Sequence, residues 1–186
     1  GLRRSRLGSG FRRFFTNTIF DSTFMLLGVV VGSAFSANPD LEVILTTMLI
    51  TSLSLGISTG VSVYEAESLE QDRRIADLER AMFRDLDETA ISRSAKKTVA
   101  LISFINFVTP LVSCLVTIAP FILAAFKVIG VRFAAWISIA LALGILFLTG
   151  VYLGKAGRRN PWIKGFRMLA FGVAAFVIGY WIESLI

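Results

Sequence analysis

The stretch that decides the fold is 18-TIFDSTFMLLGVVVGSAFSA-37, a run of 20 residues in which Asp21 is the one charged side chain. Such a run is long and apolar enough to cross a bilayer as a helix. A charged side chain in a membrane helix costs about 2.5–3.5 kcal/mol on insertion scales, so it usually faces a partner, a cavity or an ion path. The sequence therefore predicts a membrane span that carries a functional acid.

The helical neighbours of Asp21 add further metal-binding atoms. The residues that share its face, here called the Asp21 face, are Asn17, Asp21, Met25, Gly28 and Gly32. A carboxylate, an amide oxygen and a thioether on one face could ligate a divalent transition metal. The alternative interpretation is that Asp21 lies at the membrane interface, where it extends toward water or pairs with Arg12 or Arg13.

Composition places the whole chain in the membrane class. The hydrophobic fraction is 55%, the mean hydropathy is +0.72 and 17% of the residues are charged, whereas a soluble chain needs more polar surface. Because lipid offers no partners for backbone N–H and C=O groups, each span must be a helix. We expect an all-α integral membrane protein with five transmembrane helices, at residues 18–37, 42–64, 98–126, 133–154 and 166–186.

Basic residues predict the orientation. Of the 19 Lys and Arg residues, only Lys127 and Arg132 fall on one side of the predicted spans. Because cytoplasmic loops are enriched in Lys and Arg, we expect a multi-pass protein of the cell membrane with a cytoplasmic N-terminus and an external C-terminus. The basic residues adjoin the membrane ends, which argues against nucleic acid as a partner. Residues 1–17 are predicted to form a basic amphipathic segment that can lie on anionic lipid.

The second predicted span carries a polar track. Its hydroxyl side chains recur on one helical face, here called the hydroxyl stripe: Thr47, Thr51, Ser54, Ser58 and Ser62. The same face continues beyond the membrane to Glu65 and Asp72, and oxygen ligands behind an acidic mouth suit a cation path. The alternative is that these hydroxyl groups join helices. Small residues spaced four apart predict close packing within or between subunits: Gly28/Gly32, Gly56/Gly60 and Gly150/Gly154.

Residues 65–97 form a soluble segment between the first two spans (18–64) and the last three (98–186). The segment contains neither Gly nor Pro, so we expect the second span to continue as a helix into the cytoplasm. Its acidic residues are candidates for capturing a metal ion: Glu65, Glu67, Glu70 and Asp72, with a second acidic cluster at 85–88. The alternative is ordinary pairing on a helix surface, such as Glu70 with Arg74.

Histidine is absent and Cys114 is the single cysteine. A metal site would therefore use carboxylates, amides, hydroxyls, carbonyls and thioethers, which excludes a standard zinc site and favours Fe²⁺, Mn²⁺, Ca²⁺ or Mg²⁺. The third span holds Asn106, Pro110 and Pro120 as well as the cysteine, and its prolines break the helical hydrogen-bond ladder and can expose carbonyl groups toward a cavity. The usual nucleotide-binding, nucleophile and metalloprotease motifs do not occur, so we expect no enzyme and no permanently bound cofactor.

Four stretches resemble the vacuolar iron transporter family. Residues 20–34, FDSTFMLLGVVVGSA, resemble its first-helix pattern DGLxxxFxLxAGLxGA, with Asp21 at the family aspartate. Residues 53–68, LSLGISTGVSVYEAES, resemble ISMGLGGYLAxxSE, and residues 116–123, VTIAPFIL, resemble IPLLPYLL. Residues 147–182, FLTGVYLGKAGRRNPWIKGFRMLAFGVAAFVIGYWI, are similar to GYxxGRxxGxxPWxxxxxxLxxGxxAAxxxYxIG. The resemblance covers nearly the whole chain.

The resemblance implies a homodimer that moves Fe²⁺, and often Mn²⁺, out of the cytoplasm in exchange for protons. The path would lie between the subunits, with Asp21 contributed twice about a two-fold axis as metal ligand or proton-coupling group. Paired acids in a low dielectric share protons, which gives a physical route to this exchange. The family's second-helix methionine falls on Leu55, and Met25 and Met48 are the candidate substitutes.

Three functions from different classes remain open. A proton-coupled exporter of divalent metal predicts a polar cavity on the dimer axis with both Asp21 carboxylates. A cation channel of weak selectivity predicts a continuous wet path without proton coupling. A membrane adaptor that transports nothing, and whose acidic helix binds a cytoplasmic partner, predicts a dry interface in which Asp21 pairs with an arginine.

Overall fold

The computed structural model describes residues 2–36, 38–82, 90–157 and 160–185, which form helices joined by short connections. The helices are α1 (Leu2–Ala34), α2 (Leu41–Met82), α3 (Ala90–Ala125), α4 (Val131–Ala156) and α5 (Pro161–Leu185). Within these ranges, five helices are long and apolar enough to cross a membrane. The prediction of an all-α chain with five helices of this length and hydropathy is confirmed, and a multi-pass membrane protein is supported. The acidic cluster at 85–88 lies outside the described residues.

Two helices extend beyond their apolar parts. α1 runs from Leu2 to Ala34 without a break, so residues 2–17, which precede the first predicted span, belong to the same helix as that span. α2 comprises 42 residues; at 1.5 Å per residue it is about 60 Å long, roughly twice the hydrocarbon thickness of a bilayer. The predicted helical continuation of the second span is thereby confirmed.

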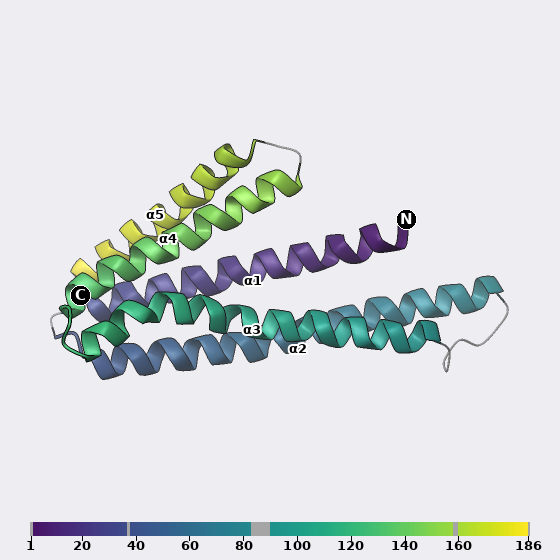
Figure 1. The fold of residues 1–186 in the computed structure, drawn as a ribbon, viewed down its shortest axis with the longest axis horizontal. Coiled ribbons are helices and arrows are strands. Elements are labelled where there is room, and N and C mark those ends of the chain that lie inside the picture. The colour runs from purple at the N-terminus through teal and green to yellow at the C-terminus, as the bar shows by residue number, and fades with distance from the viewer. Residues whose placement is uncertain (1, 37, 83–89, 158–159, 186) are drawn as a thin grey trace.

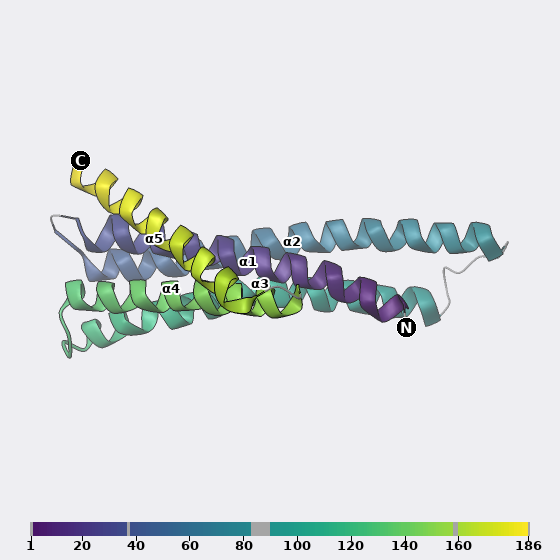
Figure 2. The same cartoon turned by 90° about the horizontal axis from the view of Figure 1, so that it is seen from above.

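Helix α1 lies at the centre of the described bundle and contacts each of the other four helices. α2 and α3 run antiparallel to one another beside α1, whereas α4 and α5 form a pair that diverges from α1 (Figure 1). The start of α1, the end of α2 and the start of α3 lie at one end of the molecule, and the C-terminal end of α5 lies at the opposite end (Figures 1 and 2). The two long extensions of α1 and α2 therefore project in the same direction.

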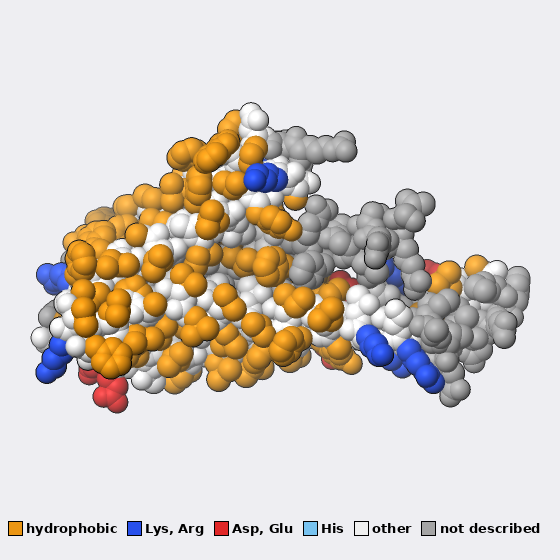
Figure 3. Space-filling model, in the orientation of Figure 1, with side chains coloured by type: hydrophobic (Ala, Val, Ile, Leu, Met, Phe, Trp, Pro, Cys, Tyr) orange, Lys and Arg blue, Asp and Glu red, His pale blue; other side chains and the backbone are white. Residues whose placement is uncertain are grey.

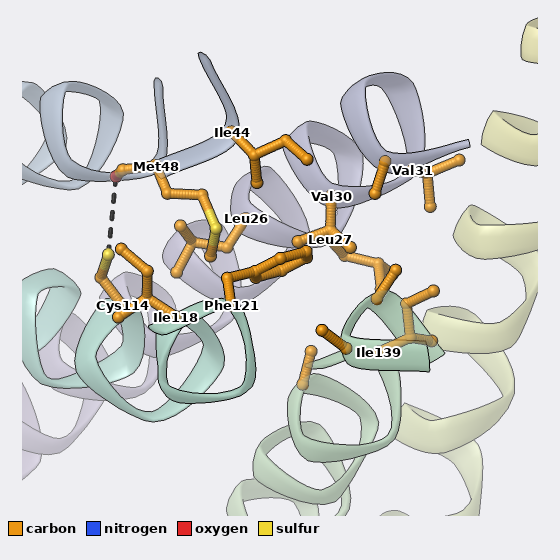
Figure 4. Packing of buried hydrophobic residues seen from close by; sticks show 14 of the residues in the cluster. Leu26, Leu27, Val30, Val31, Ile44, Met48, Cys114, Ile118, Phe121 and Ile139 are labelled. Carbon is orange, nitrogen blue, oxygen red and sulfur yellow. Dashed lines mark hydrogen bonds between the residues drawn. The ribbon is translucent and has the colours of Figure 1, made fainter. Parts of the chain in front are cut away.

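The apolar core forms where α1, α2, α3 and α4 meet (Figure 4). Phe121 of α3 is fully buried at its centre, against Leu26 and Val30 of α1. Met48 of α2 is also fully buried, and its carbonyl accepts a hydrogen bond of 3.5 Å from Cys114 Sγ. The helix interfaces nearest the C-terminal half of α1 are therefore packed and apolar.

The outer surface of the bundle is apolar as well. Figure 3 shows hydrophobic side chains over most of the described part of this face, with Lys and Arg side chains toward the ends of the helices. Leu101, Phe104 and Leu115 of α3 are each more than 60% exposed. Such a surface is unstable in water and suits contact with lipid tails.

Glycines allow two pairs of helices to approach closely within the chain. A Cβ atom added to Gly56 of α2 would lie 2.7 Å from the carbonyl oxygen of Phe107 in α3. A Cβ atom added to Gly150 of α4 would lie 2.8 Å from the carbonyl oxygen of Lys164 in α5. Larger residues at these positions would separate the backbones, so the glycines set the spacing of the α2–α3 and α4–α5 pairs.

Candidate functional site

The Asp21 face of α1 lies on the surface of the single chain. Asn17, Asp21, Gly28 and Gly32 are exposed, and Met25 is 49% exposed. Asn17 Nδ2 donates a hydrogen bond of 2.9 Å to Asp21 Oδ2. The structure therefore places all five predicted residues on one open strip. The alternative pairing of Asp21 with Arg12 or Arg13 lies outside the side chains that the structure describes.

The two glycines of the Asp21 face differ from those that join helices within the chain. A Cβ atom added to Gly28 or Gly32 would have no neighbour within 4 Å. In contrast, a Cβ atom added to Gly60 would lie 3.0 Å from Phe107 Cβ, and the contact at Gly56 is similarly tight. Gly56 and Gly60 thus pack α2 against α3, whereas Gly28 and Gly32 leave a smooth strip of α1 backbone open to a neighbouring molecule.

The opposite side of α1 explains why the Asp21 face points outward. Thr18 is buried and donates a hydrogen bond of 2.9 Å from Oγ1 to Asn106 Oδ1 of α3. Ser22 is buried one turn later, with its Oγ 3.3 Å from Ser113 Oγ of α3. These hydroxyl groups join α1 to α3 through its inner side, which leaves the outer side for Asn17 and Asp21.

The hydroxyl stripe of α2 is mostly open. Thr47, Ser54, Ser58 and Ser62 are exposed and Thr51 is half-buried. Glu65 and Asp72, which continue the same helical face, are exposed as well. Met48 lies elsewhere: it is fully buried in the apolar core, so the structure does not bring its thioether to the Asp21 face.

The acidic residues at the end of α2 are distributed over two sides of the helix. Glu67 is 9% exposed, in contrast to Glu65 and Asp72. Glu70 Oε1 accepts a hydrogen bond of 3.0 Å from Arg74 Nε, which confirms the predicted pairing of these residues. Among the described residues, no three His, Cys, Asp or Glu side chains converge as a group that could hold a metal ion. A site with several acidic ligands drawn from these described residues would therefore need side chains from more than one chain.

One residue of the polar interior has a larger role than its sequence alone indicated. Asn106 is fully buried in α3 and bonds both to Thr18 of α1 and to its own helix. The carbonyl of Asn106 lies 3.2 Å from Thr59 Oγ1 of α2. The available signal was the spacing of Asn106 and Pro110, because a proline leaves the carbonyl four residues before it without a helical donor.

No protein-family model matches the chain. The chain is distantly homologous to the uncharacterized protein MJ0645 of the archaeon Methanocaldococcus jannaschii, with 25% identity over 180 residues. The match covers 95% of this chain and 91% of the relative, so it extends over all five described helices rather than over one motif. Because that relative is uncharacterized, the function of this chain is inferred from the chemistry of the site.

Proposed function

We propose that this protein is a divalent transition-metal transporter that exports Fe²⁺ or Mn²⁺ from the cytoplasm in exchange for protons. The path would lie between two copies of the chain that meet at their Asp21 faces. The observation that carries the proposal is the exposure of Asp21, an acid inside an apolar span, on the surface of the single chain. Contact of this carboxylate with lipid would be costly, so a partner is expected to cover it.

A second copy of the chain is the cover that the surface favours. A Cβ atom added to Gly28 or Gly32 would meet no atom of the chain within 4 Å. Exposed glycines of this kind allow membrane helices to pack closely. A two-fold axis beside α1 would bring two copies of Asn17, Asp21 and Met25 together. Two carboxylates, two amides and two thioethers then supply the ligands that the described residues of one chain do not bring together.

The proposed transport direction follows from the distribution of charge. The excess of Lys and Arg on one side of the spans favours a cytoplasmic N-terminus. The extension of α2 would then project into the cytoplasm, where Glu65 and Asp72 attract cations toward the hydroxyl stripe. The resemblance of residues 20–34 and 147–182 to the vacuolar iron transporter family supports the same direction and the same class of substrate.

Metal flux in proteoliposomes tests the proposal. Purified protein is reconstituted with a pH gradient, and the uptake of Fe²⁺ and Mn²⁺ is measured for the wild type and for Asp21→Asn. We expect gradient-dependent flux that is lost in the variant. Asp40→Asn is the matched control, because Asp40 is exposed just before α2, where its Oδ1 accepts a hydrogen bond of 2.9 Å from the Glu42 N–H.

The other two functions give different results in the same experiment. Flux that requires Asp21 but ignores the pH gradient would indicate a cation channel of weak selectivity. A folded wild-type protein that moves neither metal would contradict the transporter proposal and favour the adaptor. Crosslinking of Met25→Cys in a background that lacks Cys114 measures separately whether two Asp21 faces meet.

A further inference from the structure

Pro110 creates an unusual acceptor inside the bundle. In an α-helix the carbonyl of residue 106 accepts the N–H of residue 110, but proline has no N–H, so the Asn106 carbonyl lacks this bond. Thr59 Oγ1 of α2 lies 3.2 Å from that carbonyl. The same hydroxyl lies 2.8 Å from the Leu55 carbonyl of its own helix. It also lies 3.2 Å from the Gly56 carbonyl, so one hydroxyl proton is shared among three carbonyls. Of these three, the Asn106 carbonyl is the one whose helical N–H donor is replaced by proline.

The side chain of Asn106 extends this contact to a third helix. Its Nδ2 donates a hydrogen bond of 2.9 Å to the Ile102 carbonyl, which fixes the orientation of the amide because a carbonyl can only accept. Its Oδ1 then faces α1 and accepts the hydrogen bond from Thr18 Oγ1. A single, fully buried residue therefore connects α1 and α2 through α3.

The position of Thr18 connects this residue to the candidate site. Thr18 follows Asn17 directly and precedes Asp21 by three residues, so all three lie on one turn of α1. Successive residues of a helix point about 100° apart, so the direction of Thr18 determines the direction of Asn17 and Asp21. Thr18 is 3% exposed, whereas its neighbours Asn17 and Asp21 are exposed. A rotation of α1 that released Thr18 would turn Asp21 out of its present direction.

We propose that Asn106 is a positioning residue for Asp21. By accepting the Thr18 hydroxyl while its carbonyl is held against Thr59, it fixes the rotation of α1 relative to α2 and α3. Its effect on metal binding rests on the proposed transport function, but its effect on the rotation of α1 does not. Asn106 itself is buried, and its effect on Asp21 passes through the hydrogen bond that it accepts from Thr18.

Cysteine reactivity measures the rotation directly. In a Cys114→Ala background, one reporter is Met25→Cys on the exposed face and the other is Thr23→Cys, at a position that is fully buried. Total thiol modification is measured for each as disulfide-linked dimer plus maleimide adduct, so the readout does not depend on whether the face is covered. We expect the reporter at 25 to react much faster than the reporter at 23.

The decisive variant is Thr18→Val, which removes the donor but leaves Asn106 and its other bonds in place. We expect it to lower the ratio of reactivity at 25 to that at 23 by about fivefold, the factor for one net hydrogen bond. Thr18→Ser retains the hydroxyl and should retain the ratio. Thr117→Val is the matched control, because the Thr117 hydroxyl is buried but bonds only within α3.

Each result decides the inference. An unchanged ratio in folded Thr18→Val would overturn it, as would an equal fall in Thr117→Val. A fall in Thr18→Val that Thr18→Ser does not show would support it. In flux assays Thr18→Val should need a higher metal concentration than Thr18→Ser to reach the half-maximal rate. If the wild type carries no metal, the transport function fails, but the reactivity ratio still decides whether Asn106 positions α1.

Discussion

The amide of Asn17 holds the carboxylate of Asp21: Nδ2 donates to Oδ2 at 2.9 Å along the exposed side of α1. Because the two residues are four apart on one helix, this hydrogen bond exists within a single chain. It orients the carboxylate through Oδ2, and within the described side chains Oδ1 keeps both lone pairs available. A carboxylate that is oriented before a ligand arrives loses less freedom when it binds.

The first prediction concerns Asn17. If Asp21 is a metal ligand, the hydrogen bond from Asn17 orients it for binding. Loss of a hydrogen bond that orients a metal ligand lowers metal affinity by about 10–100-fold. Asn17→Leu should therefore raise the Mn²⁺ concentration at half-maximal flux, while Asn38→Leu, at an exposed position between α1 and α2, should not. Unchanged affinity in Asn17→Leu would show that Asp21 acts without this bond.

The second prediction separates association from folding. Gly28 and Gly56 both belong to pairs of glycines spaced four apart, but an added Cβ atom meets nothing within 4 Å at Gly28 and lies 2.7 Å from the Phe107 carbonyl at Gly56. Gly56→Ala should lower the free energy of unfolding by about 1–3 kcal/mol through overpacking. Gly28→Ile should preserve thermal stability but convert dimers to monomers.

Light scattering coupled to size-exclusion chromatography measures the second prediction, together with thermal unfolding in detergent. Gly32→Ile should behave as Gly28→Ile does, because its surroundings are equally open. A dimer that tolerates isoleucine at both positions would place the interface on another part of the surface.

The sequence contained most of the fold, because the features that determine it are local. Hydropathy alone predicted the spans, and the absence of Gly and Pro after Gly60 predicted the long second helix. The spacing of Asn17 and Asp21 also predicted a shared face. The position of Met48 could not be predicted in this way, because its burial depends on Phe121 and Leu26 from other helices.

Asn106 shows the same limit for polar residues. Its spacing from Pro110 indicates a carbonyl without a helical donor, but no local pattern indicates that Thr59 of α2 lies beside that carbonyl. Likewise, Glu67 and Glu70 are three residues apart, yet only Glu67 is buried, because one side of α2 packs in this region and the other does not. Contacts between distant segments decide these cases.

The third prediction tests the link between Thr59 and Pro110. Thr59→Val removes the hydroxyl donor and leaves the buried Asn106 carbonyl without a strong partner, which should lower the free energy of unfolding by about 1–3 kcal/mol. Pro110→Ala restores a backbone N–H to that carbonyl. The two changes together should therefore cost less than the sum of the single changes, by about 0.5 kcal/mol or more. Denaturant unfolding of the four proteins in one detergent measures this coupling, and strict additivity would show that the Thr59 hydroxyl serves only its own helix.

The fourth prediction concerns the acidic extension of α2. Glu65 and Asp72 are exposed and form no ion pair with any described residue, whereas Glu70 pairs with Arg74. If the first two attract cations to the path, Glu65→Gln with Asp72→Asn should raise the half-saturating metal concentration by about twofold to fivefold at low salt. Glu70→Gln is the matched control and should change it less, because the paired carboxylate is already largely compensated. The difference should disappear near 1 M salt, where the screening length is about 3 Å. A difference that persists at high salt would instead indicate that Glu65 or Asp72 contacts the metal directly.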